Sequence, residues 1–375
     1  MIFVGPVLLI RTGPFWSLPV AWPLLKCRLQ TRLNIQENIP LAPFTTLNIG
    51  GPARYFVRAE NESDIVEALE FASERRVEVF VLGGGSNILV ADAGFDGLVL
   101  QIALSGVAYD PFNDGTTLVT AMAGEDWDML VKSCVNSDLA GVECMSGIPG
   151  FVGGTPVQNV GAYGQEVAET IESVRCLDRL TGQIVELSNQ QCGFTYRTSI
   201  FNSTERGRYI VLSVGYRLAQ GGPAKVVYKD LADRFSGDEP TLHEVRKGVL
   251  EIRRSKSMVI DPDDPNSRSA GSFFKNPIVT NGELGDLRSR FPHVPSFAFD
   301  ENFKIPAAWL IENSGFSKGY RLGNAGISTK HTLAIINAGN ATASDVIALK
   351  DKIQAKVLNE FNIELQPEPV FVGFG

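Results

Sequence analysis

The chain has 375 residues, of which 44% are hydrophobic and 20% charged, and its formal net charge is −8. This composition is ordinary for a globular protein with two or three domains. The acidic balance argues against nucleic acid as a partner, so an anionic substrate would need a local cluster of cations. Five cysteines without Cys-x-x-Cys spacing and only three histidines argue against a disulfide framework and a zinc site, and we expect no metal.

Residues 1–32 differ from the rest of the chain because they carry basic residues and no acidic one. Their apolar run is interrupted by Arg11 and by four prolines, and neither piece approaches the ~20 residues that a membrane span needs. We therefore expect an N-terminal extension that is disordered or non-native, from an upstream start codon, and no stable membrane anchoring. A weak signal-like segment is the alternative.

The first predicted unit is a strand over residues 54–59, a capped helix over 61–76 and a strand over 77–82. This order indicates a parallel βαβ unit. The second strand ends at a turn that can form an anion-binding nest for a diphosphate, made by Gly83, Gly84, Gly85, Ser86 and Asn87. Neither a Walker A loop nor a Rossmann fingerprint fits, because no Lys-Ser/Thr follows and residues 88–90 continue extended. A plain tight turn is the alternative.

Strands over residues 97–102 and 117–121 and a helix over 126–135 begin a second α/β unit. Residues 147–164 then contain six glycines and two prolines with polar residues between them. Such a composition favours a backbone pressed against a ligand, with a flexible loop as the alternative. Strands follow over residues 171–178, 183–187 and 209–218, and we place a domain boundary near residues 219–223.

The second half is predicted to be α+β. Apolar spacing indicates helices over residues 242–254, 306–313 and 344–361, and strands are expected over 333–337 and 370–372. The organisation is thus an extension over 1–32, a domain over 33–219 and a C-terminal domain over 220–375.

The side chains that could perform chemistry are few. No Gly-x-Ser-x-Gly elbow is present, and none of the three histidines lies in a nucleophile motif. Ser272 lies in a turn of small residues, Arg197 could bind a carboxylate, and Lys256 and Lys275 could pair with a diphosphate. Each of these residues also has a structural explanation: Ser272 as a turn hydroxyl, and the three cations as solvated surface residues. Glu368 could equally be a carboxylate at the edge of the last strand. Residue types alone do not favour the functional explanation.

Six motifs, taken together and in this order, resemble the UDP-N-acetylenolpyruvoylglucosamine reductase family, flavoenzymes that form UDP-N-acetylmuramate for bacterial peptidoglycan. The resemblance extends from about residue 41 to residue 373. The motifs are NIGGPA from Asn48, GGGSNIL from Gly83, the stretch from Ile148 to Gly164, YRTS from Tyr196, GSFFKNP from Gly271, and Pro367-Glu368.

The resemblance implies an FAD-binding domain of the p-cresol-methylhydroxylase type, made of two α/β subdomains, and a C-terminal α+β substrate-binding domain. It implies non-covalent FAD, NADPH as reductant, and UDP-N-acetylglucosamine enolpyruvate as substrate. Besides the turn at residues 83–87, the implied FAD-binding residues are Ile148, Pro149, Gly150, Gly153, Asn159, Gly161, Ala162, Tyr163 and Gly164. The implied catalytic residues are Arg197, Ser272 and Glu368, and the implied substrate-binding residues are Tyr196, Tyr228, Lys256, Lys275 and Asn276.

In the implied reaction, flavin N5 delivers hydride to C3 of the enolpyruvyl group, and C2 then needs a proton. Ser272 matches the family's proton donor, with Lys275 or a water as its possible activator. Arg197 and Glu368 match the positions that would stabilise the enolate. Pro369 departs from the family's usual Val and leaves the direction of the Glu368 carboxylate open. We expect a cytoplasmic monomer.

Two alternatives stay open at this point. One is an oxidase that reoxidises its flavin with O₂. Many relatives on this fold attach FAD through a histidine, and no histidine lies near either glycine-rich loop. The other is a nucleotide-sugar-binding protein without catalysis, and the joint presence of Arg197, Ser272 and Glu368 argues against it.

Overall fold

The computed structural model describes residues 33–236 and 239–374. The expected N-terminal extension, residues 1–32, lies outside the described residues. Among the described helices, none is both long and apolar enough to cross a bilayer.

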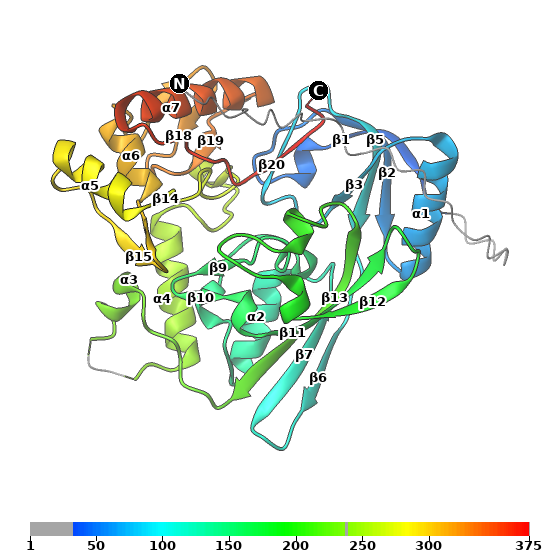
Figure 1. The fold of residues 1–375 in the computed structure, drawn as a ribbon. Helices are drawn as coiled ribbons and strands as arrows, with labels where there is room; N and C mark the ends of the chain where they lie inside the picture. Colours follow the sequence, from blue (N-terminus) through cyan, green and yellow to red (C-terminus); the bar gives the residue numbers. More distant parts are fainter. Residues whose placement is uncertain (1–32, 237–238, 375) are drawn as a thin grey trace, which may run out of the picture.

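The N-terminal sheet contains the predicted βαβ unit, and Figure 1 shows it at the upper right beside helix α1. Its elements are β1 (Gln36–Pro40), β2 (Pro52–Ala59), α1 (Glu62–Arg75), β3 (Val79–Leu82) and β5 (Phe95–Ile102). The strand order is β1-β2-β5-β3. Since β2, β5 and β3 are parallel, the prediction is confirmed, with β5 inserted between the two strands of the unit.

Helix α1 begins and ends where the sequence predicts. The Asn61 side chain accepts a hydrogen bond from the Asp64 backbone N–H at 2.9 Å, and Arg76 ends the helix in a left-handed conformation with φ 54°. Ile65 and Leu69 are buried on the face toward the sheet. Apolar residues three to four apart therefore place one side of the helix in the core.

The second sheet is antiparallel, with the order β12-β11-β13-β7-β6, and β8 pairs with β13. Its elements are β6 (Val107–Pro111), β7 (Thr116–Met122), α2 (Trp127–Asn136), β8 (Leu139–Ala140), β11 (Ile171–Asp178), β12 (Ile184–Ser188) and β13 (Tyr209–Gln220). The helix and four of these strands were predicted, whereas β6 and β8 were not. All five residues of β6 are exposed, so this strand lacks the apolar alternation that would reveal it.

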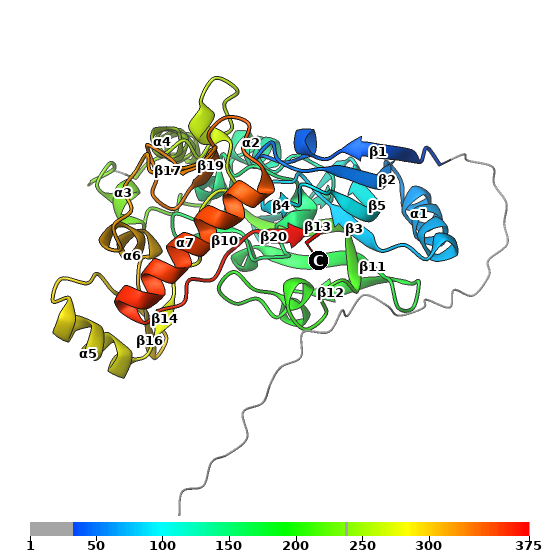
Figure 2. The same cartoon turned by 90° about the horizontal axis from the view of Figure 1, so that it is seen from above.

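The C-terminal half consists of helices and short strands. They are α3 (Lys229–Ala232), α4 (Leu242–Ser255), β14 (Ile278–Val279), α5 (Asn281–Arg290), β15 (Phe297–Phe299), β16 (Asn302–Lys304), α6 (Ala307–Asn313), β17 (Arg321–Leu322), β18 (Ala325–Ile327), β19 (Ile335–Asn337), α7 (Ala343–Phe361) and β20 (Val370–Val372). Helices α4, α6 and α7 and strands β19 and β20 match the prediction to within two residues. Viewed from above, α7 runs diagonally across this half (Figure 2).

The two halves are joined by contacts far apart in the sequence. Strand β20 pairs in parallel with β4 (Ile88–Val90), directly after the glycine turn. The Asp92 carboxylate also accepts hydrogen bonds from the backbone N–H groups of Ala343 and Ser344, at 2.6 and 3.0 Å, at the start of α7. The end of the chain is thereby held against the turn expected to bind a diphosphate.

Two large hydrophobic clusters lie on either side of the predicted domain boundary. One extends from Tyr55 to Leu218 and includes Leu242, and the other gathers residues 270–365 with three residues of the N-terminal half. Helix α4 contacts α2, and β20 returns to β4. The boundary near residue 219 stays a prediction.

Candidate active site

A cavity of about 1180 Å³ lies between the glycine-rich loops and the C-terminal half. It is larger than the about 300–1,000 Å³ of a typical small-ligand pocket, so it has room for a dinucleotide and part of a second ligand. Most of the site residues expected from the sequence line it: Gly83, Gly84, Gly85, Ser86, Asn87, Ile148, Pro149, Gly150, Gly153, Gly161, Ala162, Tyr163, Arg197, Tyr228, Lys256, Ser272, Asn276 and Glu368.

The two glycine-rich loops meet backbone against backbone. A Cβ on Gly84 would lie 2.7 Å from the Cα of Gly150, and a Cβ on Gly85, whose φ is +63°, would lie 1.8 Å from the Phe44 carbonyl oxygen. Only glycine fits at these two positions. A Cβ on Gly83, by contrast, would meet no heavy atom within 4 Å, so its backbone borders open space in the cavity.

Arg197 is held at the tip of a tight turn. Thr195 and Thr198 exchange backbone hydrogen bonds across this turn, and Arg197 has a left-handed φ of 53°. Its guanidinium donates to the Gly161 carbonyl oxygen at 2.7 Å, and its Nε lies 3.1 Å from Oε1 of Glu368. The turn therefore connects the second glycine-rich loop with the carboxylate of Glu368.

Glu368 reaches Arg197 despite the proline that follows it. Its backbone N–H donates to the Phe273 carbonyl oxygen at 2.9 Å, and its own carbonyl oxygen accepts from Asn87 Nδ2 at 3.3 Å. These bonds fix the backbone just before β20 and direct the carboxylate into the cavity. Burial raises the pKa of Glu368, although Arg197 and Lys275 oppose this effect.

Ser272 has a partner that sequence reasoning missed. Its Oγ lies 3.3 Å from Nε2 of His331, and both residues line the cavity. Burial lowers the pKa of His331 to about 4, and nearby cations add to this effect, so the imidazole is neutral at physiological pH. In the sequence, His331 only precedes a predicted strand. Its contact with Ser272 in the folded protein is what identifies it as a site residue.

A cluster of cations and tyrosines lines another part of the cavity. Tyr163 and Tyr228 make an edge-to-face contact with ring centroids 5.3 Å apart, and Lys256 Nζ lies 3.0 Å from the Asp230 carboxylate. Arg253, which the sequence did not single out, is buried, and its Nε has no hydrogen-bond partner among the described residues. This region can receive an anion.

Four expected site residues do not line the cavity: Asn159, Gly164, Tyr196 and Lys275. The buried side chain of Asn159 donates to the Thr195 carbonyl oxygen at 3.0 Å and thereby supports the turn that carries Arg197. The Tyr196 ring makes a cation–π contact, with Nζ of Lys304 3.6 Å from the ring centroid.

Comparison with known proteins places the chain in a family. Residues 53–188 match the model of an FAD-binding domain, and residues 263–372 match the model of the UDP-N-acetylenolpyruvoylglucosamine reductase C-terminal domain. The chain is 44% identical over 349 residues to the UDP-N-acetylenolpyruvoylglucosamine reductase of Thermobifida fusca, with 90% of this chain and 98% of the relative covered. The chain belongs to the UDP-N-acetylenolpyruvoylglucosamine reductase family. It is an FAD-dependent oxidoreductase.

Further relatives agree with this assignment. A reductase of the same name from Saccharopolyspora erythraea is 45% identical, covering 88% of this chain and 94% of the relative. The solved UDP-N-acetylenolpyruvylglucosamine reductase structure from Thermus caldophilus has a TM-score of 0.62 and 26% identity, covering 91% of this chain and 99% of that one. The expected p-cresol-methylhydroxylase-type fold with a C-terminal α+β domain is confirmed.

The geometry of this reductase fits FAD. The close approach of Gly84 to Gly150 builds a cradle from bare backbone, and the open space at Gly83 lets a ligand approach that backbone. The described residues contain no cluster of three or more His, Cys, Asp or Glu side chains that could hold a metal ion.

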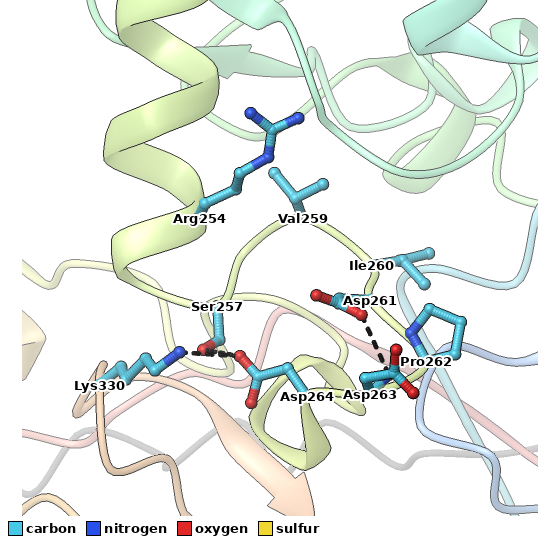
Figure 3. A pocket seen from close by; sticks show the side chains of 9 residues that line it. All are labelled: Arg254, Ser257, Val259, Ile260, Asp261, Pro262, Asp263, Asp264 and Lys330. Carbon is cyan, nitrogen blue, oxygen red and sulfur yellow. Dashed lines mark hydrogen bonds and ion pairs between the residues drawn. The ribbon is translucent and has the colours of Figure 1, made fainter.

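A second cavity, of about 650 Å³, is lined by the segment that follows α4 and by Lys330 (Figure 3). Ser257 and Lys330 line it, whereas their sequence neighbours Lys256 and His331 line the larger cavity. These two segments therefore form a wall between the cavities. The Asp264 carboxylate joins them, because it accepts from Ser257 Oγ at 2.6 Å and pairs with Lys330 Nζ at 3.0 Å.

Proposed function

We propose that this reductase uses NADPH to reduce the enolpyruvyl group of UDP-N-acetylglucosamine enolpyruvate to UDP-N-acetylmuramate, for peptidoglycan biosynthesis. The observation that carries the proposal is the convergence of Arg197, Glu368 and Ser272 on one cavity beside the glycine-rich loops. They come from three separate regions of the chain. The proposed location is the cytoplasm, and the proposed state is a monomer.

FAD held along residues 83–87 and 148–164 would supply the redox chemistry, by accepting hydride from NADPH and delivering it from N5 to C3 of the substrate. Hydride addition at C3 places negative charge on C2 and the adjoining carboxylate of the substrate. Arg197 would stabilise this charge with its guanidinium. Glu368 would donate a hydrogen bond to the same carboxylate, a role that requires its protonated form, and burial acts toward that form by raising the pKa of Glu368.

Ser272 would give its Oγ proton to C2 and complete the reduction. Oγ would take up a proton from water before the next turnover. The hydrogen-bonded neighbour of this hydroxyl among the described residues is His331, while Lys275 acts on the charge of Glu368. The two activators considered from the sequence, Lys275 or a water, did not include this histidine.

The nucleotide sugar would bind where the cations and tyrosines gather. Lys256 and Arg253 supply positive charge for a diphosphate, and Tyr228 would close over the substrate. Asn276 lines the cavity and also accepts the Ala307 backbone N–H at 2.9 Å. Tyr196 and Lys275, which do not line the cavity, would act through Arg197 and Glu368, because the Arg197 guanidinium lies over the Tyr196 ring and Lys275 acts on the charge of Glu368.

The visible spectrum of the purified protein tests this proposal. NADPH added without oxygen should bleach the flavin bands, and UDP-N-acetylglucosamine enolpyruvate should restore them. Recovery with O₂ but not with the enolpyruvyl compound would indicate an oxidase instead. Tight binding of the nucleotide sugar to protein that cannot take up FAD would indicate a binding protein without catalysis.

A further inference from the structure

His331 and Ser272 form a pair that differs from the serine–histidine pairs of nucleophilic enzymes. In those enzymes a histidine removes the serine proton, and an adjacent carboxylate stabilises the resulting cation. The charged groups that act on His331 are instead Lys256, Lys318 and Arg253, and all three are cations. An imidazole in this position is poorly suited to accept a proton and well suited to stay neutral.

The direction of the hydrogen bond follows from the chemistry that Ser272 is proposed to perform. A hydroxyl has one proton, and if that proton pointed at Nε2 of His331 it would be unavailable to C2 of the substrate. If Nε2 carries the proton instead, it donates to Oγ and leaves the hydroxyl proton free to point into the cavity. The same bond stabilises the negative charge that forms on Oγ as its proton leaves.

Hydrogen bonds hold the backbone around His331. Ser328 Oγ accepts from the backbone N–H of His331 at 3.3 Å, and Asn266 Oδ1 accepts from the backbone N–H of Thr329 at 2.9 Å. The ion pair of Lys330 with Asp264, drawn in Figure 3, anchors the residue next to His331 from the other side of the wall.

We propose that His331 is a positioning residue for Ser272. The neutral imidazole of His331 donates its Nε2–H to Oγ of Ser272. This bond orients the hydroxyl proton toward C2 and stabilises the charge that develops on Oγ. The proposal rests on the proposed role of Ser272. During the step the Oγ–H bond breaks and a C2–H bond forms. Oγ then regains a proton from water, and His331 keeps its own proton throughout.

Substitutions at both positions separate this proposal from the role of Ser272. Ser272→Ala should leave reduction by NADPH intact and slow reoxidation by the enolpyruvyl substrate by several orders of magnitude. His331→Leu removes the donor and should slow the same half-reaction by about 10²-fold, within the range of proton-transfer effects. His331→Gln keeps an amide N–H near the position of Nε2 and should recover most of that loss. His293→Gln changes an exposed histidine and serves as the control.

The double variant gives the decisive comparison. In the Ser272→Ala background, His331→Leu should cost nothing further, because the residue through which it acts is gone. An equal further loss would overturn the proposal, as would a normal rate in His331→Leu alone. Normal turnover in Ser272→Ala would instead reject Ser272 as the proton donor and leave the pair without a role. Flavin content and melting temperature of each variant identify a folding defect.

A second measurement is independent of turnover. The chain has three histidines, so protein with ¹⁵N-labelled histidine gives a simple ring-nitrogen spectrum, and His331→Gln assigns the signals. The holoenzyme at pH 7.5 should show His331 as the neutral tautomer with the proton on Nε2. A proton on Nδ1 alone, or a doubly protonated ring, would overturn the proposal.

Discussion

Nε of Arg197 lies 3.1 Å from Oε1 of Glu368, although the first residue is at the tip of a turn in the middle of the chain and the second lies two residues before β20. Both side chains are largely buried, at 22% and 16% exposed. The ion pair therefore joins two loops that are far apart in the sequence. Substitutions here should separate stability from activity.

Glu368→Gln should lower turnover by at least about 10²-fold, the effect expected from removing a group that stabilises developing charge. Its melting temperature at pH 8 should be equal to or higher than that of the unmodified protein. The raised pKa of Glu368 means that the ionised carboxyl costs folding energy above its folded pKa, and a neutral amide avoids this cost. Steady-state kinetics and thermal unfolding check both points. Glu364→Gln, at an exposed position, should change neither.

Arg197→Lys should slow flavin reoxidation by the enolpyruvyl substrate by about 10- to 100-fold and weaken FAD binding. Lysine keeps the positive charge but cannot bridge Gly161 and Glu368 at the same time, so both the enolate site and the second glycine-rich loop lose support. Stopped-flow measurement of the two half-reactions and a flavin titration of the apoprotein test this. Unchanged FAD affinity would contradict the proposed support of the loop. Arg58→Lys at an exposed position is the control.

Gly83→Ala should reduce FAD affinity at least about tenfold, or about 1.4 kcal/mol, while the apoprotein melts at the same temperature. The new methyl group meets no protein atom, so it should interfere only with a ligand in the cavity. Gly285→Ala in α5 has equally open space outside the cavity and should leave FAD affinity unchanged. If Gly83→Ala bound FAD as tightly as Gly285→Ala, this result would argue against a cofactor close to residue 83.

Acidification from about pH 6.5 to pH 4 should destabilise the protein in part through His331. Its pKa is lowered to about 4 in the folded state, so in this range the unfolded chain binds a proton that the folded chain does not. The free energy of unfolding therefore falls as the pH falls. Urea unfolding at pH 5 and pH 7.5 should show a smaller difference in His331→Gln than in the unmodified protein. His293→Gln makes the same substitution at an exposed position and serves as the control.

The sequence by itself determined the local elements and the two glycine-rich loops. Helix α1 has a capping asparagine and apolar residues on one face, and strand β3 is an apolar run that ends in glycine. Such signals act between residues a few positions apart, so they can be read along the chain. The membership of Arg197, Ser272 and Glu368 in one site required the resemblance to a family, because each alone resembles many residues elsewhere.

Only the tertiary structure decided which groups meet. Three contacts join residues that are distant in the sequence. They are the insertion of β5 between β2 and β3, the Arg197–Glu368 pair and the contact of His331 with Ser272. The protonation states of Glu368 and His331 depend on burial, which no local pattern encodes. The chemistry of this site therefore follows from desolvation and from contacts across the fold, whereas its backbone elements follow from local periodicity and turn chemistry.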